Sequence, residues 1–145
     1  MRALVQRVMR ASVTSDGELV GSIGAGACVL VGVTHTDTEV VACKVAKKIA
    51  TLRIFDDDAG VMNRSLQDVG GSVLAVSQFT LYGDTAGGRR PSWINAARPE
   101  LAEPLVDCLV GELRNLGVHV ETGRFRTNMA VELVNDGPVT VMIEL

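Results

Sequence analysis

The alternation of apolar and polar residues predicts a chain built mainly of strands. Residues 2–14 are rich in β-branched side chains, and Asp16-Gly17 follows as a hairpin turn, because glycine tolerates the positive φ that such turns need. Residues 18–23 return as a second strand. The continuous apolar run at residues 28–33 predicts a strand that is covered on both faces.

Two segments have the spacing of amphipathic helices. The first starts at Thr36-Asp37-Thr38-Glu39, which matches a capping box, and its apolar stripe is Val41, Val45, Ile49 and Leu52. The second covers residues 100–116, with a stripe at Leu105, Leu109, Leu113 and Leu116. Gly117 is a good stop for this helix, whereas Pro104 means that the helix either starts there or kinks.

The remaining apolar runs predict more strands, at residues 53–55, 72–80, 118–121, 129–134 and 139–145. These strands outnumber what two helices can cover, and the last run is almost wholly apolar. We therefore expect a strand-dominated α+β fold, a single domain over residues 1–145, with a barrel-like antiparallel or mixed sheet. We also expect a second copy of the chain to cover part of the sheet in a homodimer.

Composition and charge narrow the class of protein. Apolar residues make up 47% of the chain and charged residues 21%, which is typical of a globular protein rather than a disordered one. The net charge of −3 disfavours a protein that coats nucleic acid non-specifically, although a local basic patch such as Arg89 and Arg90 remains compatible with contact to RNA. With no membrane-length apolar run and no signal peptide at the start, we expect a cytoplasmic protein without membrane contact.

The sequence contains no ordinary catalytic motif. Neither His35 nor His119 belongs to a nucleophile–base motif, and Ser77 lacks the glycines of a nucleophile elbow. The three aspartates of the turn at residues 56–60 lack the further ligands of a calcium loop, so we expect no metal and no cofactor. The cysteines form no C-x-x-C motif, and we expect each to be a buried small hydrophobe: Cys28, Cys43 and Cys108.

Two motifs carry a stronger signal. Ser77-Gln78-Phe79-Thr80-Leu81 resembles the SQ-x-T-L motif of the D-aminoacyl-tRNA deacylases, and Asn135-Asp136-Gly137-Pro138-Val139-Thr140 resembles their N-x-G-P-V-T motif. The two occur in order and near the usual spacing of the family. Shorter matches run along the whole chain: Gln6-Arg7-Val8, Leu52-Arg53-Ile54-Phe55, Met62-Asn63, Asp68-Val69-Gly70-Gly71, Arg90-Pro91-Ser92 and Val131-Glu132-Leu133-Val134.

The resemblance implies a homodimer whose active site lies at the subunit interface and takes the 3′ end of an aminoacyl-tRNA. In the family the Gly-Pro pair, here Gly137-Pro138, is a cis peptide that reaches into the partner's pocket. Its two carbonyl oxygens occupy the space that an L side chain would need, so only D-amino acids and glycine, including glycine misattached to alanine tRNA, are removed. The local sequence alone favours an ordinary hairpin turn at Asp136-Gly137.

The resemblance also implies the roles of the first motif. The main-chain N–H groups of Phe79 and Thr80 hold the ester carbonyl and its oxyanion, Gln78 and Phe79 shape the pocket, and the 2′-hydroxyl of the terminal ribose assists water. The hydroxyls of Ser77 and Thr80 are equally compatible with a structural role, in which they form hydrogen bonds to the backbone at the end of a strand, and with a catalytic role. Thr80 has no base nearby in the sequence, so its hydroxyl would be a weak nucleophile.

Further site residues follow from the same resemblance. Met129, Asn135 and Thr140 are expected to bind substrate, although core packing explains Met129 almost equally well. Contacts to tRNA are expected from Arg89, Arg90 and Arg126.

Two stretches depart from the family pattern. Lysines that often precede Arg-Pro-Ser-Phe are absent from residues 85–93, where Arg89 replaces part of their charge. The family commonly has Phe-Gly-Ala before the methionine, whereas this chain has Phe125-Arg126-Thr127-Asn128-Met129. If that loop lines the pocket, the larger residues alter the preference at the acceptor end or add a phosphate contact.

Three functions remain open at this point. The first is a tRNA-editing esterase. The second is a dimeric RNA- or ligand-binding protein that uses the same groove without hydrolysis. The third, a hydrolase with cysteine or histidine nucleophilic machinery, is the weakest, because no motif positions such groups.

Overall fold

The computed structural model describes residues 1–145 and is dominated by one strongly curved sheet. The strand order is β2-β1-β3-β6-β7, and β8 pairs with the other edge of β1. The strands at β3, β6 and β7 are parallel, whereas β1 is antiparallel to each of its partners. The strand bounds are β1 (Arg2–Ser15), β2 (Glu18–Ile23), β3 (Gly26–Gly32), β6 (Ser72–Ser77), β7 (Val120–Thr122) and β8 (Met129–Glu144).

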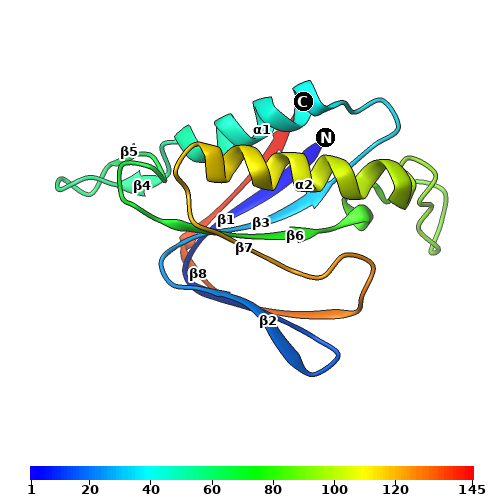
Figure 1. Cartoon of the computed structure of the whole chain (residues 1–145), viewed down its shortest axis with the longest axis horizontal. Helices are drawn as coiled ribbons and strands as arrows, with labels where there is room; N and C mark the ends of the chain where they lie inside the picture. Colours follow the sequence, from blue (N-terminus) through cyan, green and yellow to red (C-terminus); the bar gives the residue numbers. More distant parts are fainter.

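The curvature of the sheet comes from the long strand β1, which changes partner along one edge. Its first half pairs with β3 and its second half with β2, while β8 follows it along the opposite edge. The second half of β1 and the first half of β8, which pair with each other, therefore turn away from the helices and carry β2 to the far side of the sheet (Figure 1). There β2 crosses β7 so closely that a Cβ at Gly21 would lie 2.9 Å from the carbonyl oxygen of Thr122. The sheet is thus barrel-like and nearly closed, as predicted.

Two helices, α1 (Glu39–Thr51) and α2 (Pro99–Asn115), lie side by side on one face of the sheet (Figure 1). The predicted stripes face the core: Val45 and Ile49 of α1 are fully buried, as are Leu105, Leu109 and Leu113 of α2. Burial of each such side chain contributes about 1.5–3 kcal/mol. The main core is therefore the layer between the helices and the sheet.

A second, smaller core fills the inside of the curved sheet. It contains side chains from the far face of β3 and β6, such as Cys28, Leu74 and Val76, packed against Val13 and Ile23. Because helices cover the near face of β3 and this cluster covers its far face, β3 is apolar along its whole length, as the continuous run predicted.

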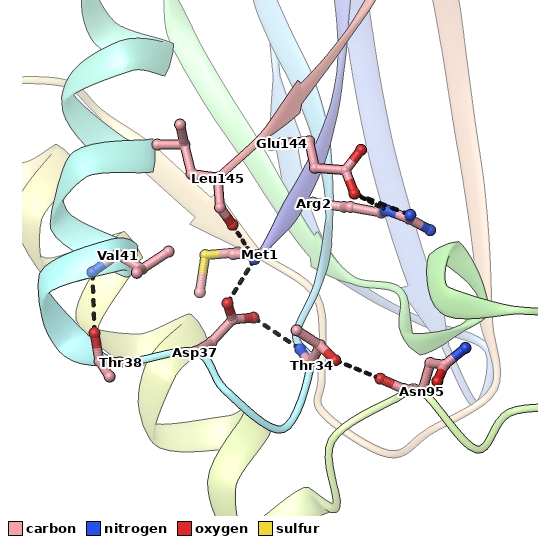
Figure 2. A network of polar contacts seen from close by, with 9 residues as sticks. All are labelled: Met1, Arg2, Thr34, Asp37, Thr38, Val41, Asn95, Glu144 and Leu145. Atoms are coloured by element: carbon pink, nitrogen blue, oxygen red, sulfur yellow. Dashed lines mark hydrogen bonds and ion pairs between the residues drawn. The ribbon is translucent and has the colours of Figure 1, made fainter.

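The start of α1 differs from the capping-box prediction. Thr38 is the N-cap, and its hydroxyl accepts a hydrogen bond from the N–H of Val41 at 3.4 Å. Asp37 is engaged elsewhere, since its carboxylate accepts from the amino group of Met1 at 2.6 Å and from the N–H of Thr34 at 2.7 Å (Figure 2). The prediction of a cap at Thr36 is therefore wrong, and Asp37 instead ties the start of α1 to β1.

Helix α2 ends where the sequence predicts, but it starts before Pro104. The helix begins at Pro99 and continues through Pro104. Gly117 ends it with a φ of 83°, and the N–H groups of Gly117 and Val118 donate to the carbonyls of Arg114 and Leu113 at 2.9 and 3.1 Å. These are the two hydrogen bonds of a Schellman motif, which glycine favours because it has no Cβ.

Three further segments differ from the predicted strands. The strand predicted through Thr80 ends at Ser77, and the 3-10 helix η1 (Phe79–Tyr82) follows it. The two strands predicted at the end of the chain form one strand, β8. A short hairpin of β4 (Phe55–Asp56) and β5 (Met62–Arg64) replaces the strand predicted at residues 53–55.

No helix of the structure has both the length and the hydrophobicity needed to cross a membrane. The prediction of buried cysteines holds for Cys28 only, because Cys43 and Cys108 are partly exposed, with their sulfur atoms 3.8 Å apart between α1 and α2.

Candidate active site

A pocket of about 620 Å³ opens where β3 and β6 end. Its walls are mainly apolar and come from the ends of these strands, the first turns of α2, and the loop and strand start at residues 125–131. Such a cleft, apolar with a few polar groups, is typical of a small-ligand site. The lining residues that the sequence singled out are Ser77, Gln78, Phe79, Met129 and Arg126.

The first motif forms one wall of this pocket. Ser77 is the last residue of β6, and the N–H of Gln78 donates to the carbonyl of Val31 at 2.7 Å, which holds the turn against β3. Ser77, Gln78 and Phe79 line the pocket, but Thr80 does not. The exposed Thr80 hydroxyl accepts a hydrogen bond from the side-chain amide of Gln78.

Two main-chain donors of this motif are unpaired. The carbonyls at the start of η1 are used, since Leu81 N–H donates to Gln78 and Gly83 N–H to Thr80. The N–H groups of Phe79 and Thr80 have no acceptor in the protein, as expected for the first amides of a helical turn. They are therefore free to donate to a carbonyl oxygen of a bound molecule at the pocket wall.

The loop before β8 forms another wall of the pocket. Met129 lines the pocket and also packs against the inner core, and its role in substrate binding stays a prediction. Thr127 fixes this loop: its hydroxyl accepts from the hydroxyl of Ser15 at 2.7 Å and donates to the carbonyl of Arg124 at 2.9 Å. Between these anchors, Arg126 has a φ of 58°, which non-glycine residues rarely adopt.

The second motif lies away from the pocket of its own chain. Gly137 and Pro138 are exposed, neither lines the pocket, and the peptide bond between them is cis. They belong to a bulge in β8, because Asn135 pairs with Val8 and Thr140 with Gln6. The hairpin turn that the local sequence alone favours is thus absent, and the pair projects from a continuous strand with the cis peptide that the resemblance implied.

Arg7 supports this projection, and the sequence analysis did not single it out. Its side chain is only 6% exposed. The guanidinium donates to the carbonyl of Ile54 at 2.7 Å and forms ion pairs with Asp56 at 3.3 Å and Asp136 at 3.1 Å. A buried charge needs such partners, so Arg7 joins the β4–β5 hairpin to the base of the Gly137–Pro138 projection.

Asn135 and Thr140 close the base of the projection. The side-chain amide of Asn135 donates to the carbonyls of Arg7 and Val139 at 2.8 and 2.9 Å, and the hydroxyl of Thr140 donates to Asn135 at 3.3 Å. Neither residue lines the pocket of its own chain. In one chain they hold the shape of the bulge, and their role in substrate binding stays a prediction.

The predicted basic patch lies on a loop beside the pocket. Arg89 and Arg90 are exposed between η1 and α2 and do not line the pocket. Trp93 of the same loop packs over Gly83 and meets Phe79 edge-on, with ring centroids 5.4 Å apart. This contact connects the arginine loop to the pocket wall.

The histidine and cysteine side chains lie outside the pocket. His35 contacts the carbonyl of Ile94 at 2.7 Å and His119 contacts Glu121 at 3.0 Å, both on the surface. Burial raises the pKa of the Cys28 thiol to about 11, and burial together with the neighbouring Cys43 raises that of Cys108 to about 11. None of these groups lines the pocket, which argues against the cysteine or histidine hydrolase.

Fold and site thus define a class: a nearly closed sheet with two helices on one face, whose mostly apolar pocket is lined by no histidine, cysteine or carboxylate. Residues 4–144 match the family model described as D-Tyr-tRNA(Tyr) deacylase, and the chain belongs to this family.

Individual proteins agree with this assignment. A protein of Symbiobacterium thermophilum named D-aminoacyl-tRNA deacylase is 62% identical over 144 residues, which is 99% of this chain and 95% of that protein. A solved structure described as c-Myc DNA Unwinding Element Binding Protein has a TM-score of 0.93 at 38% identity, covering 100% of this chain and 99% of the other. A structure of a probable eukaryotic D-amino acid tRNA deacylase has the same fold, with a TM-score of 0.86 at 17% identity over 99% of this chain and 98% of that one.

Proposed function

We propose that the protein hydrolyses the ester bond of D-aminoacyl-tRNA, releasing the D-amino acid and free tRNA, and that it also removes glycine misattached to alanine tRNA. The observation that carries the proposal is the turn at residues 77–80, where the N–H groups of Phe79 and Thr80 have no acceptor in the protein and Phe79 lines a mostly apolar cleft. The family match and the names of its relatives supply the substrate class. Such an activity belongs in the cytoplasm, where charged tRNA is used.

In this proposal the protein supplies electrostatic stabilisation and the substrate supplies the base. The amides of Phe79 and Thr80 donate hydrogen bonds to the ester carbonyl oxygen as it becomes an oxyanion. Removal of one such donor lowers the kcat of an enzyme by about 10²–10³. The 2′-hydroxyl of the terminal ribose assists the attacking water, because no histidine, carboxylate or lysine that could act as a general base lines the pocket. Ser77 and Gln78 shape the wall beside the reacting ester.

The Thr80 hydroxyl takes no part in this mechanism, which gives a prediction. We expect Thr80→Ala to retain kcat within about threefold of the wild type, since loss of a general base or nucleophile costs at least about 10². Single-turnover hydrolysis of D-Tyr-tRNA measures this directly. A folded but inactive Thr80→Ala protein would instead make the hydroxyl a catalytic group.

A second copy of the chain is needed for the selection of D-amino acids. Gly137 and Pro138 project from β8 away from their own pocket, so as a gate they would have to enter the pocket of a partner. Their carbonyl oxygens would then fill the space that an L side chain requires. Exposed apolar side chains on or next to β8 suit coverage by this second copy: Val131, Met142 and Leu145.

The oligomeric state tests this arrangement. Light scattering of the purified protein should give twice the chain mass of 15.4 kDa. A monomer that still discriminates between D and L esters would exclude a gate supplied by a partner.

A binding protein without hydrolytic activity is the second candidate. It is favoured by the name of one structural relative, which describes a DNA-binding protein, and by the exposed Arg89 and Arg90 beside the pocket. Incubation of D-Tyr-tRNA with catalytic amounts of the protein distinguishes the two functions. Release of D-tyrosine over many turnovers supports the deacylase, whereas stoichiometric binding without release supports the second candidate.

A further inference from the structure

Arg126 is the single charged residue among the 16 that line the pocket. It is exposed and forms no ion pair with any carboxylate of the chain, in contrast to Arg124 two residues earlier, which pairs with Glu18 at 3.0 Å. The guanidinium therefore remains available to an anionic group of a bound molecule.

The backbone at Arg126 is held in place by its neighbours. Thr127 is bonded to Ser15 and to the carbonyl of Arg124, and Arg124 is bonded to Glu18. With both sides anchored, Arg126 adopts a φ of 58°, a conformation that glycine adopts without cost and that is unfavourable for arginine. Arg126 thus combines an unfavourable backbone conformation with an unpaired cationic side chain at a pocket. A backbone outlier in such a position indicates a functional constraint.

We propose that Arg126 binds the phosphodiester on the 5′ side of the terminal adenosine, and so determines how strongly the protein holds the end of its substrate. This deepens the proposed function and rests on it. The apolar walls suit the nucleoside and the aminoacyl group, neither of which carries a negative charge that would neutralise Arg126. This phosphodiester is the first anionic group of the tRNA backbone next to the terminal adenosine, and a guanidinium matches its two free oxygens.

A pair of minimal substrates isolates the phosphate. The D-tyrosyl ester of adenosine has no phosphodiester, whereas the D-tyrosyl ester of the dinucleotide CpA has one. We expect Arg126→Gly to raise KM about tenfold for the CpA ester, the size of one charged hydrogen bond, with kcat unchanged. For the adenosine ester, KM and kcat should both stay within twofold of the wild type.

Three further variants separate charge from structure. Arg126→Gln should behave like Arg126→Gly, and Arg126→Lys should recover part of the affinity for the CpA ester. Arg64→Gln is the control, an arginine of the β4–β5 hairpin that pairs with Asp58 at 2.9 Å outside the pocket, and should leave both KM values unchanged. Arg126→Gly should unfold at the same temperature as the wild type or higher, because glycine relieves the backbone at this φ.

Binding of CpA and of adenosine, both without an attached amino acid, tests the proposal independently of hydrolysis. If the wild type cleaves neither ester, the proposed function fails, and the ratio of the two Kd values in the wild type and in Arg126→Gly still decides the role of Arg126. Equal losses for CpA and adenosine, or no loss for either, would overturn the phosphate contact. A loss confined to CpA supports it.

Discussion

D-Tyr-tRNA whose terminal adenosine lacks the 2′-hydroxyl, with the amino acid on the 3′ oxygen, should resist hydrolysis by this protein. The pocket contains no histidine, carboxylate or cysteine, so nothing in the protein can replace the lost hydroxyl as the group that assists water. General base assistance contributes about 10²–10⁴ to a rate, and we expect a fall in kcat of that size. Single-turnover release of labelled D-tyrosine from the deoxy and normal substrates gives the ratio.

A binding control makes the result specific to chemistry. The deoxy substrate should still compete with normal D-Tyr-tRNA, because the main-chain donors at Phe79 and Thr80 and the apolar walls are unchanged. Cleavage of the deoxy substrate at the normal rate would show that the base lies in the protein. Together with an inactive Thr80→Ala, it would move the chemistry to the side chain of Thr80.

Shortening the projection at Gly137 and Pro138 is expected to admit L-aminoacyl-tRNA. Between the pairings of Gln6 with Thr140 and of Val8 with Asn135, β8 has three residues more than β1. Deletion of Gly137 and Pro138 therefore leaves one extra residue, and the strand can still pair on both sides. With the carbonyl oxygens withdrawn from the partner's pocket, hydrolysis of L-Tyr-tRNA should rise at least tenfold, about 1.4 kcal/mol of lost discrimination.

Two comparisons show whether the effect belongs to the projection. Pro138→Ala is a smaller change at the same place and should give a smaller rise in L-Tyr-tRNA hydrolysis. Pro104→Ala on the exposed side of α2 is a matched proline control and should leave the D-to-L ratio unchanged. Loss of D-Tyr-tRNA hydrolysis without any gain for the L ester, in a folded deletion variant, would assign the projection a structural role instead of a gate.

Local patterns predicted most of the fold because local physics determines those parts. The first two strands, the turn at Asp16-Gly17, and the apolar faces of both helices follow from periodicity and from turn chemistry, and the structure confirms them. Thr38 rather than Thr36 caps α1, because Asp37 is drawn into contacts with Met1 and Thr34. That choice depends on Met1, 36 positions before Asp37, which a window of a few residues does not contain.

The motifs named candidate residues, but they did not predict how these residues are arranged. Five of the candidates line one pocket, and their roles there stay predictions: Ser77, Gln78, Phe79, Arg126 and Met129. The bulge at residues 136–139 looks like a hairpin turn in the sequence, because its shape depends on Asn135 and Arg7. Arg7 itself resembles a polar residue in an alternating strand, and only its burial at the base of the projection shows its importance.

Hydrolysis of D-Tyr-tRNA and L-Tyr-tRNA by the same preparation, with and without a thiol-blocking reagent, tests whether the protein is a D-selective deacylase that uses main-chain donors. We expect rapid loss of the D ester, a rate for the L ester equal to that without protein, and no effect of thiol blocking. If both esters survive, the protein is a binding protein without hydrolytic activity. If both are lost at the same rate, Gly137 and Pro138 do not act as a chiral gate. Thiol-sensitive hydrolysis would contradict a mechanism based on main-chain donors.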